Sequence, residues 1–328
     1  MPAHSIDGPV HSERVSAPAR HTRTGFTLIE LLVSMVLGVV ILAISANFAT
    51  ATLRSSRGID MRDGLNRDAR FVGLAISRDI QDAGIAFEST QTFGSVASRG
   101  DTVVAISVPY LPNQAEVYNM VVPADTTDPL PSGGTCGTTC IDVVDPNLVP
   151  FQLSAGDVAL LQVQNERRLI VLTNVAPNGA GVRRLTWSNA DSLFVYPAGL
   201  TGDLRLTRNG VAVQRLNVTA WYHNTANNTL VRADGFTPDG QLRTSITARG
   251  VDTFATRLQF TNGTERTEAN GFDADTTNDY DRIVSVVVRA RMRVERADRS
   301  VNGGAPLHRN YEWRITPRNL IFERNRVL

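Results

Sequence analysis

The sequence predicts an α+β protein, in which one long N-terminal helix precedes an antiparallel, β-rich domain. Three observations support this. The 25 residues from Phe26 to Thr50 are almost all apolar and contain a single charge, Glu30. A helical amphipathic pattern continues over residues 51–84. From residue 95 to residue 328, short segments rich in Val, Ile, Leu and Thr alternate with turn residues, which is typical of strands.

Composition places the chain among folded proteins and excludes some functions. The chain has 328 residues, of which 42% are hydrophobic and 20% charged. This length suffices for one large domain or two smaller ones. The formal net charge is +1, and every one of the 33 basic residues is an arginine. Such a near-neutral balance argues against a general electrostatic grip on nucleic acid, although it does not exclude a nucleic-acid partner.

The apolar run from Phe26 to Thr50 is long enough to cross a membrane as a helix, because about 20 residues span the hydrocarbon core. Arg20 and Arg23 precede it, which places the N-terminus in the cytoplasm and the chain after about residue 50 outside it. A cleaved secretory signal fits poorly because the run is too long for one. A plain signal anchor explains the length but not Glu30, since a carboxylate near the bilayer centre costs about 2.5–3.5 kcal/mol.

The stretch G-F-T-L-I-E-L-L-V, which begins at Gly25, resembles the processing signal of type IV pilins and pseudopilins. In that family a membrane prepilin peptidase cuts after the glycine and methylates the new N-terminus. The resemblance implies that residues 1–25 are a cleaved leader, that Phe26 becomes the methylated N-terminus, and that Glu30 serves assembly. A buried charge without a partner costs several kcal/mol. Pairing of Glu30 with the amine of a neighbouring subunit would therefore fix the register of packed helices.

A second helical segment is expected to follow the membrane segment over residues 51–84. Its apolar residues recur every three or four positions, as on one buried face: Leu65, Ala69, Val72, Ile76, Ile80 and Ala83. Asp63 and Arg67 stand four residues apart in the order that favours an ion pair. Gly84 is a plausible stop. We expect four glycines to bend or loosen the helix: Gly38, Gly58, Gly64 and Gly73.

The remaining chain predicts strands at Thr102–Val108, Val158–Val163, Leu169–Val175, Val211–Trp221 and Ile283–Val294. Asn209-Gly210 lies between two apolar-alternating segments, 204–208 and 211–215, and predicts a two-residue hairpin. Tyr118–Pro150 is interpreted as a long loop region. It contains Cys136 and Cys140, which lack the second ligand pair of a zinc site, so an exported domain favours a small disulfide that pins one loop.

The C-terminal third adds to the resemblance. The segment Gly250–Phe260, the following D-R-I-V-S-V-V-V-R-A-R-M-R-V run and the closing F-E-R-N-R-V-L are similar to minor pilins of the PilW type. This implies a pilin-like layout, in which the long helix packs on the β-rich domain.

Two surface features are candidate ligand sites. Asp273, Asp275, Asp279 and Asp281 alternate with other residues as calcium ligands do, but the glycine and closing glutamate of an EF-hand are missing. A solvated turn is the favoured interpretation, with no cofactor, and calcium is the alternative. Arg289, Arg291 and Arg293 share one strand face that could bind phosphate. No aromatic residues interleave them, which favours a solvated face.

The sequence therefore predicts a minor pilin, without enzymatic activity, that assembles into a type IV pilus. Its expected partners are prepilin peptidase, other major and minor pilins and the inner-membrane assembly platform. We expect a single pass of the inner membrane before assembly, a periplasmic domain, and then a place in the pilus at the cell surface. Two alternatives remain open. One is a minor pseudopilin of type II secretion, and the other is a membrane-anchored adhesin or DNA receptor outside a filament.

Overall fold

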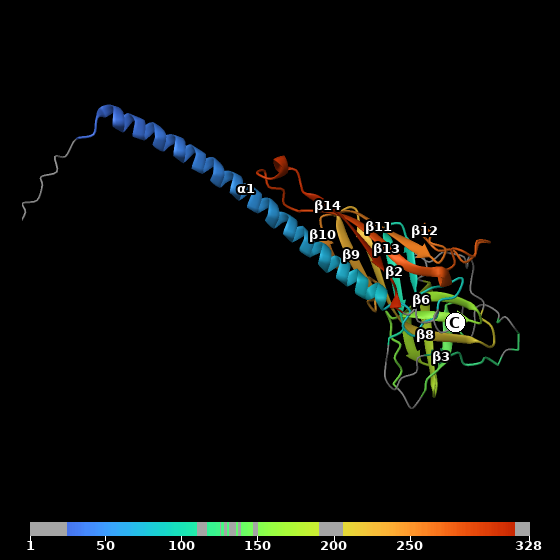
Figure 1. Cartoon of the computed structure of the whole chain (residues 1–328). Coiled ribbons are helices and arrows are strands. Elements are labelled where there is room, and N and C mark those ends of the chain that lie inside the picture. The colour runs from blue at the N-terminus through green and yellow to red at the C-terminus, as the bar shows by residue number, and fades with distance from the viewer. Residues whose placement is uncertain are drawn as a thin grey trace, which may run out of the picture. The chain divides into compact units, whose positions relative to one another are not determined.

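A computed structural model describes residues 25–109, 117–124, 126–127, 130, 136, 139–146, 150–189 and 206–318 (Figure 1). The chain divides into an N-terminal unit, residues 1–55, and a C-terminal unit, residues 56–328. Helix α1 (Leu28–Gln81) is 54 residues long and contributes to both units. A long N-terminal helix followed by antiparallel sheets confirms the predicted α+β class.

The described part of the N-terminal unit is the apolar half of α1 and the three residues before it. Every residue from 25 to 55 except Gly38 is exposed. Exposed apolar side chains on this scale need a lipid or protein environment. Within the described residues, α1 is the one helix long and apolar enough to cross a membrane.

The second half of α1 belongs to the C-terminal unit and presents the predicted apolar stripe to the core. All six residues of the stripe are buried, and Ile76 and Ile80 are fully inaccessible. The helix ends at Gln81, and Gly84 then takes a positive φ of 83° and donates its N–H to the carbonyl of Ile106 at 2.8 Å. Since this conformation favours glycine, the predicted stop has a physical basis.

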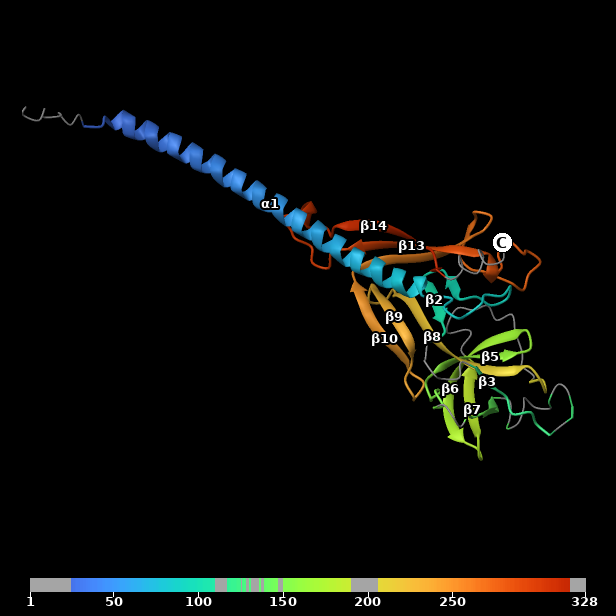
Figure 2. The same cartoon turned by 60° about the horizontal axis from the view of Figure 1, so that its bottom comes forward.

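Two antiparallel layers flank this half of α1 (Figure 2). We call the first the helix-side sheet; its strand order is β1-β2-β8-β9-β10. The second is the C-terminal sheet, with the order β12-β11-β13-β14. The strands of the helix-side sheet are β1 (Val96–Arg99), β2 (Thr102–Ser107), β8 (Val211–Asn224), β9 (Thr229–Phe236) and β10 (Leu242–Arg249). Those of the C-terminal sheet are β11 (Val251–Phe260), β12 (Glu265–Arg266), β13 (Ile283–Arg293) and β14 (His308–Ile315), with short 3-10 turns at η3 (Tyr280–Arg282) and η4 (Asn302–Gly304).

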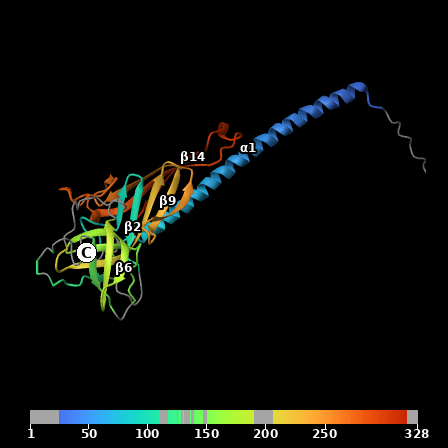
Figure 3. The same ribbon diagram turned by 180° about the vertical axis from the view of Figure 1, so that it is seen from behind.

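A small barrel is inserted between β2 and the second half of β8 (Figure 3). Its further strands are β3 (Val117–Asn119), β4 (Cys140–Val144), β5 (Val158–Val163), β6 (Glu166–Pro177) and β7 (Val182–Asn189). The pairing runs β8-β5-β6-β7-β4, and β3 pairs with β8. A bridge between Met120 and Val143 links the β3 end to β4 and closes the ring.

Strand β8 connects two separate hydrophobic cores. Val211 and Val213 point into the barrel core, whereas Leu216 and Val218 belong to the core under α1. Side chains alternate along a strand, so the step of three from Val213 to Leu216 moves the apolar set to the opposite face. One continuous strand thereby serves both cores.

The predicted strands are present, but two other predictions were wrong. The supposed loop region 118–150 contains β4 and most of β3. The hairpin around Asn209-Gly210 does not form: Leu206 and Thr207 are in no strand, and residues 204–205 lie outside the described residues. Gly210 does turn, with a φ of 72°, but its carbonyl accepts the N–H of Gln164 from the β5–β6 turn. Asn209-Gly210 determines only the local backbone conformation, whereas the strand that lies beside this segment is distant in the sequence.

Gly73 lets the C-terminal sheet approach α1 closely, which is a different role from the expected bend. A Cβ at this position would collide with the indole of Trp313 in β14, lying 2.8 Å from its Cε2. Tyr311 stacks on Trp313 with ring centroids 5.8 Å apart. Its hydroxyl reaches Asn66 of α1 at 3.0 Å. The missing side chain thus allows an aromatic pair to pack on the helix.

Two alanine substitutions on α1 test this packing. A Cβ at Gly64 would have no atom within 4 Å, so Gly64→Ala should raise the free energy of unfolding by up to about 1 kcal/mol through helix propensity. Gly73→Ala should lower it by about 1–3 kcal/mol, because the methyl group displaces Trp313. Denaturant unfolding of the full chain in detergent, followed by Trp fluorescence, measures both. Equal effects of the two substitutions would contradict the packing account.

Candidate functional site: the processing and assembly segment

The predicted processing residues lie in a short non-helical segment before α1. Gly25, Phe26 and Thr27 have no regular secondary structure, and the helix begins at Leu28. Phe26 is 82% exposed. The peptide bond between Gly25 and Phe26 is therefore accessible and outside the helical hydrogen-bond ladder, which is the state that a peptidase requires of its substrate.

Thr27 and Glu30 form a reciprocal cap at the start of α1. The Thr27 hydroxyl oxygen accepts the backbone N–H of Glu30 at 3.3 Å. In return, Oε2 of Glu30 accepts the backbone N–H of Thr27 at 3.4 Å and lies 3.3 Å from its hydroxyl. The first N–H groups of any helix lack intrahelical partners, and this capping box satisfies two of them.

The cap explains how one chain tolerates Glu30 within an apolar segment. Its carboxylate lies at the positive end of the helix dipole and has hydrogen-bond donors in its own backbone. From the sequence, Glu30 was assigned to a neighbouring subunit, and the role of Thr27 was missed. The signal was nevertheless readable, because Thr-x-x-Glu before an apolar run is the capping-box pattern.

Comparison with known families supports the processing interpretation. Residues 20–46 match the family described as prokaryotic N-terminal methylation motif. The matched span includes Gly25, Phe26, Thr27 and Glu30 and most of the exposed apolar helix. The chain therefore carries a type IV pilin-like prepilin signal, which implies processing by prepilin peptidase and membrane anchoring through the apolar helix. Curated proteins provide no match to the chain.

A charged contact fixes the end of α1 to the helix-side sheet. Asp79 accepts the indole N–H of Trp221 in β8 at 2.9 Å and the Nε–H of Arg232 in β9 at 2.8 Å. Trp221 is 1% exposed, and hydrogen bonding to Asp79 raises the pKa of Arg232 above its usual value. One carboxylate thus ties the helix to two neighbouring strands.

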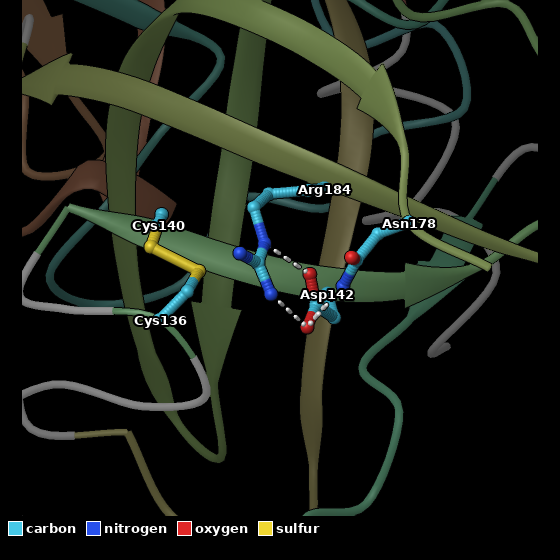
Figure 4. The surroundings of a disulfide bond; sticks show 5 residues. All are labelled: Cys136, Cys140, Asp142, Asn178 and Arg184. Carbon is cyan, nitrogen blue, oxygen red and sulfur yellow. Dashed lines mark hydrogen bonds and ion pairs between the residues drawn. A yellow bond between two sulfur atoms is a disulfide. The ribbon is translucent and has the colours of Figure 1, made fainter.

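The predicted disulfide between Cys136 and Cys140 is present at the start of β4 (Figure 4). Two residues further on, Asp142 accepts two hydrogen bonds from Arg184 in β7, at 2.9 and 3.0 Å. Asn178 donates a third at 3.0 Å. The disulfide and this cluster lie close together at the start of β4 and fix the position of the chain where this strand begins.

The acidic loop uses its first two carboxylates to brace itself. Asp273 accepts side-chain N–H groups from Asn270 and Asn278 at 3.0 and 3.1 Å and a backbone N–H from Asp275. Asp275 in turn accepts Arg266 at 2.7 Å and the hydroxyl of Thr277. Hydrogen bonds from Thr277, followed by the one from Arg266, lower the pKa of Asp275. These oxygens accept hydrogen bonds from donors in the loop and from Arg266 of β12.

Asp279 is in a different situation from the other three carboxylates. It is 3% exposed, and its Oδ1, like that of Asn278, is buried with no hydrogen-bond partner. Burial, followed by the charges of Asp281 and Asp273, raises the pKa of Asp279. Asp281 lies at the surface, 3.7 Å from Arg282. In the part of the chain that is described, no three His, Cys, Asp or Glu side chains form a metal-binding group.

The arginine face of β13 is largely neutralised. Arg289 lies 2.8 Å from Glu312 and 3.2 Å from Glu265, and Arg293 lies 3.2 Å from Asp252. Arg291 is exposed between them. Two of the three guanidinium groups therefore have carboxylate partners on neighbouring strands, and the face offers little free positive charge to a phosphate.

The raised pKa of Asp279 predicts a pH dependence of stability. The folded state holds this proton more tightly than the unfolded state, so the stability it contributes is present below the unfolded pKa and is lost as pH rises through the folded pKa. Asp279→Asn cannot ionise and should become more stable than wild type as pH rises above the usual aspartate range. Thermal unfolding between pH 3 and pH 8, with a chelator present, measures the difference.

The Asp279→Asn variant also distinguishes whether the buried carboxylate of Asp279 binds a proton or a calcium ion. If calcium occupies the two unpartnered oxygens, millimolar calcium chloride should stabilise wild type and leave Asp279→Asn unchanged. Asp281→Asn, at the neighbouring exposed carboxylate, serves as the control and should follow wild type. A pH-independent difference between wild type and Asp279→Asn would contradict the raised pKa.

Proposed function

We propose that this chain is a minor pilin of the PilW type, a structural and not a catalytic subunit of a type IV pilus. The observation that supports this most is the methylation motif at residues 20–46 on a helix whose apolar surface is exposed and contains one carboxylate. An exposed apolar helix suits a bilayer before assembly and a bundle of equivalent helices afterwards. The motif fits a type II secretion pseudopilin equally well, and the segments around Gly250–Phe260 and in β13 favour the pilus.

Cleavage after Gly25 would change the electrostatics of the helix start. Hydrolysis of the Gly25–Phe26 bond releases residues 1–25 and leaves an ammonium group on Phe26, one turn from Glu30. A cation at a helix N-terminus is unfavourable, because the dipole is positive there. A carboxylate partner therefore stabilises the new amine. Processing creates this positive charge, and assembly would bring a carboxylate next to it.

Assembly would then exchange the partner of Glu30. In the single chain, this carboxylate is held by the neutral donors of Thr27 at 3.3–3.4 Å. A charge-assisted bond to an ammonium is about twice as strong as a neutral one. The Phe26 amine of a neighbouring subunit would compete successfully with the cap. The capping box is in this account the resting state of a membrane-inserted subunit, and the inter-subunit pair is the assembled state.

The C-terminal unit would present a surface outside the membrane and the helix bundle. Its two sheets hold the second half of α1, and the barrel adds a further core beyond them. A membrane-anchored adhesin or DNA receptor would share these features but would have no use for processing at Gly25.

Mass spectrometry of the N-terminus in purified filament and membrane fractions tests this function. We expect a filament-borne chain that begins at N-methylated Phe26. Gly25→Val should accumulate in the membrane with residues 1–25 attached, whereas Gly38→Val, in the apolar helix, should be cut normally. A filament or surface fraction that retains the leader on the wild-type chain would refute the proposal.

A further inference from the structure

A groove of about 640 Å³ lies beside the second half of α1, entirely within the C-terminal unit. Helix α1 forms one wall, with residues that recur every three or four positions from Met61 to Phe71. Residues 246–249 of β10 form a second wall, and residues 293–296, at the end of β13 and just after it, form a third side. This volume is within the range of about 300–1,000 Å³ that is typical of ligand sites.

The lining provides apolar surface that the single chain leaves open. Phe71 is 61% exposed, and Ile246 is 55% exposed. Met61 and Val294 are half-buried, and Leu65 is buried. All five residues line the same groove. Exposed apolar side chains that share a groove indicate a ligand with an apolar part.

The groove also contains charges without a partner in the chain. Four such residues line it: Arg249, Arg296, Asp68 and Glu295. None of the four forms an ion pair or a side-chain hydrogen bond with any residue that the structure describes. Arg293, the remaining charged residue of the lining, is neutralised by Asp252 at 3.2 Å. The free charges therefore balance, two positive against two negative, and a ligand head that carries both charges fits them better than a purely anionic head.

Strand β14 shows which end of the groove lies nearer the apolar run of α1. Arg309, the second residue of this strand, donates to Oδ1 of Asn66 at 3.0 Å. Trp313, four residues later, packs at Gly73. Strand β14 therefore runs along α1 away from the apolar run, and its first residues mark the near end of the groove.

The arginines gather at this near end. Arg293 is paired with His308, the first residue of β14. The N–H of Arg293 donates to the carbonyl of Gly250 at 2.7 Å, which places the neighbouring residue Arg249 at the same end. Phe71 is the last groove residue of α1 and lies at the other end. The groove is thus polarised, with guanidinium groups at one end and an aromatic ring at the other.

We propose that this groove binds one phospholipid with a zwitterionic head, phosphatidylethanolamine, from the membrane in which α1 is anchored. The phosphate would lie between Arg249 and Arg296, because guanidinium groups form strong paired hydrogen bonds with phosphate oxygens. The ammonium group would pair with Glu295, which precedes Arg296 in the sequence. One acyl chain would extend along the groove and cover Phe71 and Ile246.

The near end of the groove is within reach of a lipid. Met61 follows Thr50, the last residue of the apolar run, by eleven residues, which is about 16 Å of helix. A bilayer about 40–45 Å thick contains two lipids end to end, so one lipid is longer than this distance. The lipid could therefore place one chain in the groove and direct the other to the bilayer. The inference goes beyond the proposed function, because it requires the membrane anchor but no filament.

Photo-cross-linking of the full chain in lipid nanodiscs tests the groove. The probe is phosphatidylethanolamine with a diazirine at the end of one acyl chain. The chain contains no lysine, so trypsin cuts only after arginine. It separates the anchor peptide, Thr24–Arg54, from the groove peptide, Phe71–Arg78. Phe71 lies about 30 Å of helix beyond Thr50, out of reach of a lipid that stays in the bilayer.

We expect label in both peptides of the wild-type chain. The anchor peptide is labelled by any surrounding lipid and serves as the internal reference. The groove peptide is labelled only by a lipid that has entered the groove. Label confined to the anchor peptide would overturn the proposal.

Two double variants test which groups hold the head. Arg249→Gln with Arg296→Gln should reduce the label of the groove peptide several-fold, because the phosphate loses both guanidinium groups. Arg67→Gln with Arg291→Gln is the matched control, since both arginines are exposed and lie outside the groove. The ion pair predicted between Asp63 and Arg67 was wrong, so the control breaks no such contact. An equal loss of label in the two double variants would contradict the assignment.

Headgroup preference is a separate measurement. Phosphatidylglycerol with the same diazirine carries a phosphate but no ammonium group, and it should label the groove peptide several-fold less. Glu295→Gln with Asp68→Asn should remove this difference, because the carboxylates attract the ammonium group and repel the anionic lipid. Equal labelling of the wild-type chain by both lipids would refute the zwitterionic head. Nanodiscs contain no filament, so failure of these tests would leave the proposed function intact.

Discussion

An exposed apolar helix that holds one carboxylate is the constraint on which the rest of this structure depends. From Leu28 to Leu53, the large apolar side chains of α1 are exposed. Such a surface is stable only in lipid or against other helices, and Glu30 would be costly in either place without a partner. The capping box with Thr27 supplies that partner within a single chain. In the proposed function, the chain stays in the membrane with this internal bond and exchanges it on assembly for a bond to a neighbouring subunit.

In the C-terminal unit, specific contacts fix the second half of α1 to the two sheets. Gly73 brings Trp313 of β14 against the helix backbone, and Asp79 ties the last turns to Trp221 and Arg232. These contacts come from both sheets, through β8 and β9 in the middle of the β-rich sequence and β14 near its end.

The sequence could predict what local patterns determine. The helix stripe and the long strands follow from periodicity, because burial of one face imposes a period of 3.6 or 2. The barrel could not be predicted, since it depends on pairings such as that of Val213 in β8 with Tyr118 in β3. Gly210 takes a positive φ, as Asn209-Gly210 predicted, but the predicted hairpin does not form there. At the candidate site, the motif predicts roles for Gly25, Phe26 and Glu30, and the Thr-x-x-Glu pattern that indicates the cap was overlooked. Asp273 and Asp275 were considered as calcium ligands, but they stabilise the acidic loop by accepting hydrogen bonds. The spacing of the aspartates does not predict these hydrogen bonds.

The most direct test of the central claim replaces the charge of Glu30 and keeps its hydrogen bonds. Glu30→Gln retains an oxygen that can accept from Thr27, so the cap, membrane insertion and cleavage after Gly25 should survive. The quantity to measure is the amount of the processed variant in sheared filaments relative to the amount in the membrane. We predict a processed chain that stays in the membrane, because a neutral amide is a poor partner for the Phe26 ammonium of a neighbour. Recovery in filaments at the wild-type level would contradict the account.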